Sequence, residues 1–208
     1  MRNGFCFLAD RLPDSIKGVS VDTRACTAIA IILKMESECS VQEKALYITG
    51  KLFCRDYGTV LAMAKCTSEE LDAAIVEYLC GAPQAKTWRE LHEGASPAKE
   101  TAPQQKDFDF IQDSAAIVAA FRQVYGLSLE ETCELHWWEF LALFNSLPLE
   151  GNSFMGIRRL RTMQSKRTDS PEARAELAKA KRKVALKDTR SPERKQADSK
   201  AVFDALEL

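Results

Sequence analysis

The sequence lacks the short motifs that accompany most enzymatic chemistry. It contains no glycine-rich phosphate loop, no GxSxG turn, no HExxH pair and no EF-hand loop. His92 and His136 are its only two histidines, so few side chains can act as an imidazole base. These absences predict that the chain is not an enzyme and needs no cofactor.

Long apolar runs are also missing. No stretch approaches the roughly 18–20 consecutive apolar residues of a membrane-spanning helix. The apolar run within the first ten residues is too short for a secretory signal. We therefore expect a soluble, cytoplasmic protein that makes no contact with a membrane.

The seven cysteines form no CxxC pair, which excludes the usual zinc-ribbon and thioredoxin patterns. Several fall on apolar helix faces, where a reduced thiol packs as a small hydrophobic group. Cys133 and His136 lie one helical turn apart and raise the question of a metal ligand or a nucleophile. No second Cys or His pair is nearby in the sequence, so we expect reduced, structural thiols and no metal site.

Charge is distributed unevenly along the chain. Residues 157–208 carry 15 Lys/Arg and 8 Asp/Glu, a net charge of +7, whereas residues 1–156 carry a net charge of −8. The basic segment has three interpretations: a nucleic-acid arm, a solvated helical face, or an arm that binds protein. Its eight acidic residues and its single aromatic, Phe203, argue against nucleic acid.

Residues 1–93 are predicted to form a short β-ribbon followed by helices. Two short β-prone segments flank Gly18 and predict the ribbon. The spacing of apolar residues predicts helices over 22–36, 41–52, 58–65 and 67–80. The last of these opens with a capping box, Thr67-Ser-Glu-Glu70, and ends at Gly81.

Residues 94–106 contain no large apolar side chain and read as a linker, because such a composition cannot offset the entropy of ordering. Beyond it, residues 107–165 predict a helix over 107–125 and a second helix from the capping box Ser128-Leu-Glu-Glu131 to about residue 147. These two form an αα-hairpin, and a short helix follows within 151–161.

Residues 166–208 predict a charged helical tail. Ser170-Pro-Glu and Ser191-Pro-Glu each place a Ser N-cap before a Pro at the first helical position. The expected fold is therefore mainly α: two small helical subdomains with a short N-terminal β-ribbon, joined by a linker, and a charged helical C-terminal tail.

Trp137 and Trp138 are adjacent on the predicted second helix of the hairpin. Adjacent helical residues point about 100° apart, so the two indoles cannot share one narrow face. If Trp137 is buried, Trp138 lies at the edge of the core or outside it, where an exposed Trp is a favoured anchor for a partner. The alternative is that Trp138 fills a gap against Phe154 or the N-terminal half.

Several segments resemble a known family. They are residues 113–126, Leu135-His-Trp-Trp-Glu-Phe140, Leu143-Phe-Asn-Ser-Leu147 and Ile157-Arg-Arg-Leu-Arg161, together with Leu12-Pro-Asp-Ser and Val21-Asp-Thr-Arg24 near the N-terminus. These resemble the phage family named for gene product fifteen, found in long-tailed phages and prophages of Gram-positive bacteria. The His-Trp-Trp-x-Phe helix is the most specific of these motifs.

The resemblance implies a tail assembly chaperone in the bacterial host cytoplasm. Genes of this family usually lie between those for the major tail protein and the tape measure protein. The implied partners are the tape measure protein and, as a second candidate, the major tail protein; a homo-oligomer is also left open. We predict Trp138, Arg158, Arg159 and Arg161 as the partner-binding residues.

Two alternatives stay open beside the chaperone. A structural virion protein, in the head–tail connector or the tail, would be retained in finished particles. A DNA-binding phage protein would bind duplex with steep salt dependence and would need residues 166–208.

Overall fold

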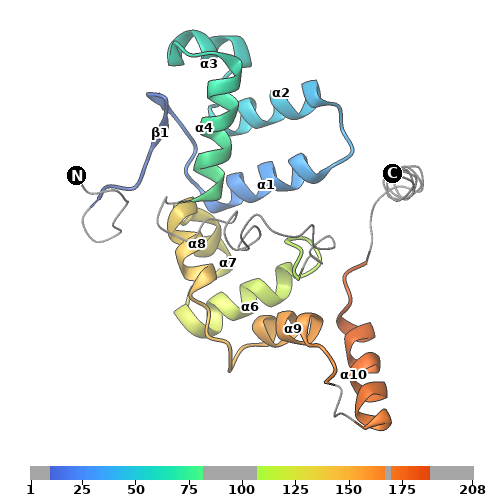
Figure 1. Cartoon of the computed structure of the whole chain (residues 1–208). Helices are drawn as coiled ribbons and strands as arrows, with labels where there is room; N and C mark the ends of the chain where they lie inside the picture. Colours follow the sequence, from blue (N-terminus) through green and yellow to red (C-terminus); the bar gives the residue numbers. More distant parts are fainter. Residues whose placement is uncertain (1–9, 82–106, 167–169, 188–208) are drawn as a thin grey trace, which may run out of the picture. The chain divides into compact units, whose positions relative to one another are not determined.

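The computed structural model describes residues 10–81, 107–166 and 170–187 (Figure 1). A β-ribbon and a series of helices confirm the mainly α prediction. In chain order the elements are β1 (Ser15–Ile16), β2 (Val19–Ser20), α1 (Ala25–Glu36), α2 (Val41–Leu52), α3 (Tyr57–Ala64), α4 (Ser68–Cys80), α6 (Ser114–Tyr125), α7 (Leu129–Glu134), α8 (Trp137–Asn145), α9 (Ser153–Thr162) and α10 (Pro171–Val184).

The ribbon is a tight antiparallel hairpin in which Ile16 pairs with Val19. Lys17 and Gly18 between them have φ angles of 50° and 78°. Positive φ at both central residues is the geometry of a two-residue hairpin turn, and Gly18 adopts it without strain. Ile16 and Val19 are 5% and 1% exposed, so the ribbon lies with one face in the core.

Local capping signals set the starts of several helices. The predicted capping boxes at Thr67 and Ser128 are both present. The side chain of each cap residue accepts from the backbone N–H of the glutamate three residues later, and the carboxylate of that glutamate accepts from the backbone N–H of the cap residue. A third box, Ser40 with Glu43, opens α2. Ser40-x-x-Glu43 has the same sequence signature, and that signature would have found it.

The single helix predicted from 128 to 147 is wrong, because the chain breaks between α7 and α8. Ala25 N donates to Leu135 O at 2.8 Å, and Trp137 N donates to Thr23 O at 2.6 Å. Arg24 and His136 form an isolated antiparallel bridge between these two contacts. The backbone at 135–137 therefore bonds to residues 23–25 in place of continuing the helix.

The helix predicted from residue 107 begins later, at Ser114. The Asp109 carboxylate accepts from the backbone N–H groups of Ile111 and Gln112, both at 2.9 Å. The Asp113 carboxylate accepts from Asp109 N, also at 2.9 Å. These two aspartates stabilise a turn ahead of α6, because their carboxylates accept from backbone N–H groups and so replace the carbonyl acceptors of a regular helix.

One core spans both predicted subdomains. Its most deeply buried large side chains come from each side of residues 94–106: Ile31, Leu52, Val60 and Leu71, and Trp137, Phe121, Phe140 and Phe154. Phe140 stacks between Trp137 and Phe121, with ring centroids 5.6 and 5.0 Å away. The first compact unit runs to Met163. The predicted linker 94–106 lies outside the described residues.

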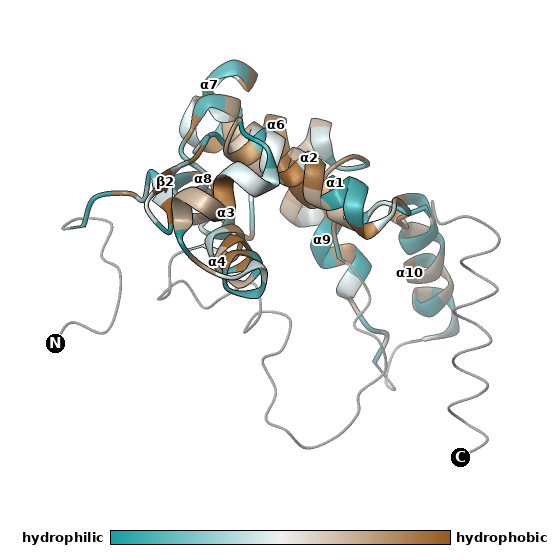
Figure 2. Cartoon of the chain, turned by 90° about the horizontal axis from the view of Figure 1, so that it is seen from above, coloured by the Kyte–Doolittle hydropathy of each residue, from teal (hydrophilic) through white to brown (hydrophobic). Residues whose placement is uncertain are grey.

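The second unit begins at Gln164 and contains α10. Ser170 caps α10 by accepting from Ala173 N, with Pro171 at its first position, as predicted. Charged and alanine residues alternate along α10, which is coloured by hydropathy in Figure 2. None of the residues of this helix is buried. The helix predicted after Ser191 lies outside the described residues. Within the described ranges, no helix has the length and apolar character to cross a bilayer.

Candidate functional site: an apolar groove between α2 and α4

The two adjacent tryptophans hold the end of α4. Trp137 Nε1 donates to Leu79 O at 3.0 Å, and Trp138 Nε1 donates to Tyr78 O at 2.9 Å. The last carbonyls of a helix have no donor within the helix, so the Trp137 indole pairs Leu79 O, and the Trp138 indole adds a second donor to Tyr78 O beside Gly81 N. Trp138 is only 8% exposed. Its predicted place as an exposed anchor is therefore wrong, and the alternative of packing against the N-terminal half holds.

His136 joins the same junction from the other side. Its Nδ1 accepts from Trp138 N at 3.1 Å and caps α8, which assigns the ring proton to Nε2. Nε2 lies 2.9 Å from Pro13 O. Cys133 belongs to α7, on the far side of the helix break, and burial raises its thiol pKa. In the part of the chain that the structure describes, no group of His, Cys, Asp and Glu residues is arranged to hold a metal ion.

The predicted arginines have different surroundings. Arg158 donates through Nε to Asp107 Oδ2 at 2.9 Å, and its guanidinium lies 5.1 Å from the ring centre of Phe108. Arg161 donates through both terminal nitrogens to the Asp113 carboxylate, at 2.6 and 2.8 Å. Arg159 is exposed. Arg158 and Arg161 therefore stabilise the packing of α9, and Arg159 alone of the three points to solvent.

The Arg161–Asp113 pair is buried, with side chains 10% and 5% exposed. Burial raises the Asp113 pKa, but the hydrogen bonds from Arg161 and from the Asp109 backbone favour the carboxylate and bring its pKa below the ordinary value. Bidentate contact of this kind fixes the distance between α9 and the start of α6.

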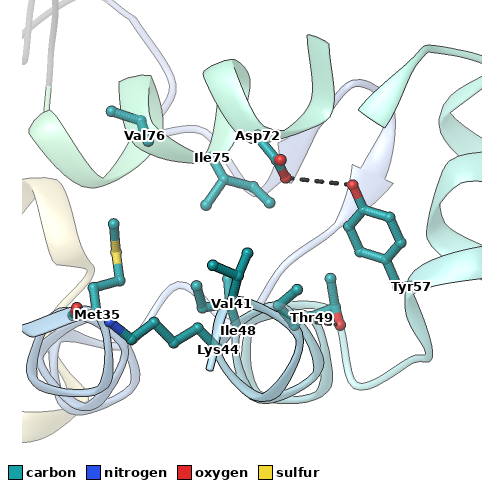
Figure 3. Close-up of a pocket in the computed structure, with 10 residues that line it drawn as sticks. Met35, Val41, Lys44, Ile48, Thr49, Tyr57, Asp72, Ile75 and Val76 are labelled. Atoms are coloured by element: carbon teal, nitrogen blue, oxygen red, sulfur yellow. Dashed lines mark hydrogen bonds between the residues drawn. The ribbon is translucent and has the colours of Figure 1, made fainter. Parts of the chain in front are cut away.

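An apolar groove of about 240 Å³ lies between α2 and α4 (Figure 3). Ile48 from α2 and Ile75 from α4 face each other across it, with Met35 towards one end and Tyr57 at the other. Its lining is mostly apolar and consists of Met35, Val41, Lys44, Ala45, Ile48, Thr49, Tyr57, Asp72, Ile75 and Val76.

The mouth of the groove exposes apolar side chains to solvent. Val41 is 84% exposed, Val76 42% and Met35 39%. A flexible Met thioether can adapt to different apolar partners. Grooves with these properties accept the apolar stripe of an amphipathic helix.

Two polar contacts lie at the ends of the groove. Lys44 Nζ donates to Met35 O, at the end of α1, at 2.9 Å. Tyr57 donates through its hydroxyl to Asp72 at 3.5 Å (Figure 3). We expect these contacts to define the length of the groove.

Sequence reasoning missed this groove. The recurrence of apolar residues at 41, 45, 48 and 52 marks one face of α2, and such a face is ordinarily assigned to the core. Part of this face stays uncovered because of the way in which α1, α3 and α4 pack around α2. No pattern among neighbouring residues specifies that packing.

One thiol near the groove has altered chemistry. Lys34 Nζ lies 2.8 Å from Cys39 Sγ, in the connection between α1 and α2. Hydrogen bonds from Lys34 and then from Ser37 lower the Cys39 pKa, since they stabilise the thiolate. The six cysteines within the described ranges are all free thiols.

Comparison with known proteins identifies the family. Residues 22–186 match the family model described as bacteriophage Gp15 protein. The matched span runs from just before α1 to just after α10 and includes both the groove and the His136-Trp137-Trp138 junction. No curated protein and no solved structure matches the chain. Because the match covers well over half of its residues, the chain belongs to the bacteriophage Gp15 protein family.

Proposed function

We propose that this phage protein is a tail assembly chaperone that binds the tape measure protein while the tail forms and that catalyses no reaction. The observation that carries the proposal is the groove between α2 and α4, which presents apolar side chains to solvent in a protein of a phage family. The choice of the tape measure protein as the partner rests on the sequence resemblance to the phage family.

The physical task of such a chaperone fits the groove. A tape measure protein is long and helical, and it aggregates if its apolar stripes stay exposed before the tail tube surrounds it. A groove that takes one apolar stripe covers that surface reversibly and needs no reacting group. Exposed Val41 and Val76 at its mouth extend the contact beyond the enclosed volume.

The proposed contact residues change accordingly. Trp138, Arg158 and Arg161 are engaged within the chain, so they act by holding the fold together. The groove replaces them as the proposed contact surface. Arg159, which is exposed, stays a proposed additional contact.

The test is capture of the partner during assembly. Tagged full-length protein is expressed with the neighbouring phage genes, recovered by its tag, and its partners are identified by mass spectrometry. We expect the tape measure protein in the eluate, unchanged by nuclease treatment, and no bait in purified mature tails. Bait retained at a fixed ratio in finished tails would make the protein a structural virion component. Loss of capture after nuclease treatment would instead indicate binding through nucleic acid.

A further inference from the structure

We infer that the groove between α2 and α4 binds a basic amphipathic helix, with the apolar stripe of that helix on Ile48 and Ile75 and its Lys or Arg side chains towards α4. The inference rests on the proposed function and specifies the kind of tape measure segment that the groove takes. Three features carry it: the apolar floor, the length of the walls and their charge.

The floor and the length of the walls fix the size of the occupant. The walls, α2 and α4, are 12 and 13 residues long. The residues of α2 that line the groove run from Val41 to Thr49, and at about 1.5 Å per residue they span roughly 12 Å, which matches about two turns of a bound helix. The lining on α4 is shorter and runs from Asp72 to Val76. Such a helix presents apolar residues at i, i+3 or i+4, and i+7, enough to cover the floor and reach Val41.

Charge selects among the amphipathic helices. α4 carries four acidic residues and no basic one: Glu69, Glu70, Asp72 and Glu77. Asp72 lines the groove. Glu69 lies three residues before Asp72 and Val76 lies four residues after it, so all three side chains are on the same side of α4. Both Glu69 and Asp72 are exposed. A partner with Lys or Arg beside its apolar stripe gains attraction from this wall, and an acidic partner is repelled.

The opposite wall does not cancel this charge. Lys44 is the basic residue among those lining the groove, and its ammonium is bonded to the Met35 carbonyl at the end of α1. Its ammonium therefore lies at the Met35 end of the groove, whereas Asp72 lies at the Tyr57 end (Figure 3). The wall formed by α4 stays acidic, which gives the bound helix a preferred rotation about its axis.

The experiment uses two synthetic helical peptides of about 14 residues with the same Leu/Ala stripe, one flanked by Lys and the other by Glu. Binding to the full-length protein is measured by fluorescence anisotropy.

Val41→Asp changes the mouth of the groove, and Leu46→Asp is its matched control, because Leu46 is 62% exposed on the same helix and does not line the groove. Asp72→Lys reverses the charge of the acidic wall. Glu150→Lys, in the exposed connection between α8 and α9, is the control for charge reversal. Circular dichroism confirms that each variant is folded.

We expect the Lys peptide to bind at least about tenfold more tightly than the Glu peptide, which corresponds to two or three favourable charge contacts. Val41→Asp should weaken the Lys peptide by about tenfold, with Leu46→Asp within about twofold of the natural chain. Asp72→Lys should reduce the preference for the Lys peptide, and Glu150→Lys should leave it unchanged. Equal binding to the Val41→Asp and natural chains, or equal binding of the two peptides, would overturn the inference.

The same variants separate this inference from the proposed function. If the natural chain and both groove variants capture the tape measure protein equally well, the chaperone proposal stands and the groove is not its site. If the Lys peptide binds in the groove but the natural chain captures no tape measure protein, the groove assignment stands and the proposed function fails.

Discussion

Replacement of Trp138 by alanine tests the burial of the aromatic motif most directly. The indole is 8% exposed, its ring centre lies 6.1 Å from that of Tyr78, and its Nε1 donates to Tyr78 O. Loss of a buried Trp side chain costs about 3–5 kcal/mol through lost burial and the cavity that remains. The hydrogen bond accounts for about 1 kcal/mol of this, because Tyr78 O keeps a second donor, Gly81 N. Against a total stability of about 5–15 kcal/mol, the expected loss is large.

The assays are thermal unfolding and urea unfolding, both followed by circular dichroism, since removal of a Trp alters fluorescence directly. Trp138→Ala should lower the melting temperature by about 6–20 °C for a chain of this size. Leu129→Ala is the control: Leu129 is 56% exposed, and its loss should change stability by no more than about 0.5 kcal/mol. If Trp138→Ala unfolds at the natural midpoint with the same slope but loses its partner, Trp138 is a surface anchor and the reasoning from burial is refuted.

Three further outcomes are expected. Tyr78→Phe should raise stability by about 1 kcal/mol in thermal melts, because the Tyr78 hydroxyl is buried without a hydrogen-bond partner among the described residues; a loss of stability would reveal a partner. Asp113→Asn should cost about 3–5 kcal/mol at pH 7, because it removes the buried carboxylate that accepts from both terminal nitrogens of Arg161. Since folding lowers the Asp113 pKa, the natural chain should lose this stabilisation as the pH falls below about 4. The Asp113→Asn variant should lack that part of the pH dependence. Parallel curves of stability against pH for the two chains would contradict a stabilising role of the Asp113 carboxylate. Lys34→Met should slow alkylation of Cys39 by iodoacetamide at neutral pH, measured by mass spectrometry, because Lys34 lowers the thiol pKa; an unchanged rate would show that Lys34 does not activate Cys39.

The elements that sequence reasoning predicted well are those specified by neighbouring residues. The capping boxes at Thr67 and Ser128 and the Ser170-Pro171 start each depend on residues no more than three positions apart. The hairpin turn at Gly18 is equally local. Such signals act before any tertiary contact forms, so a single sequence contains them.

The features that were missed depend on residues far apart in the chain. The break at Leu135 exists because Ala25 N and Thr23 O bond to its backbone, and no local pattern at 128–147 signals that competition. The contact between Arg161 and Asp113 could not be predicted for the same reason, because the two residues are 48 positions apart in the chain. The exposure of the groove is a third case, since it depends on where α4 packs over α2.

The junction between α4 and α8 has a consequence for synthesis on the ribosome. Trp137 and Trp138 bond to carbonyls 58 and 60 residues earlier in the chain, and His136 reaches back to Pro13. At about 5–20 residues per second, roughly 3–12 s separate the translation of Leu79 from that of Trp137. During that interval the nascent N-terminal half holds apolar faces and helix-end carbonyls whose partners have not yet been made. A protein proposed to protect another chain from aggregation therefore passes through an aggregation-prone stage itself, and a fragment ending at residue 106 should be recovered only as insoluble or rapidly degraded material.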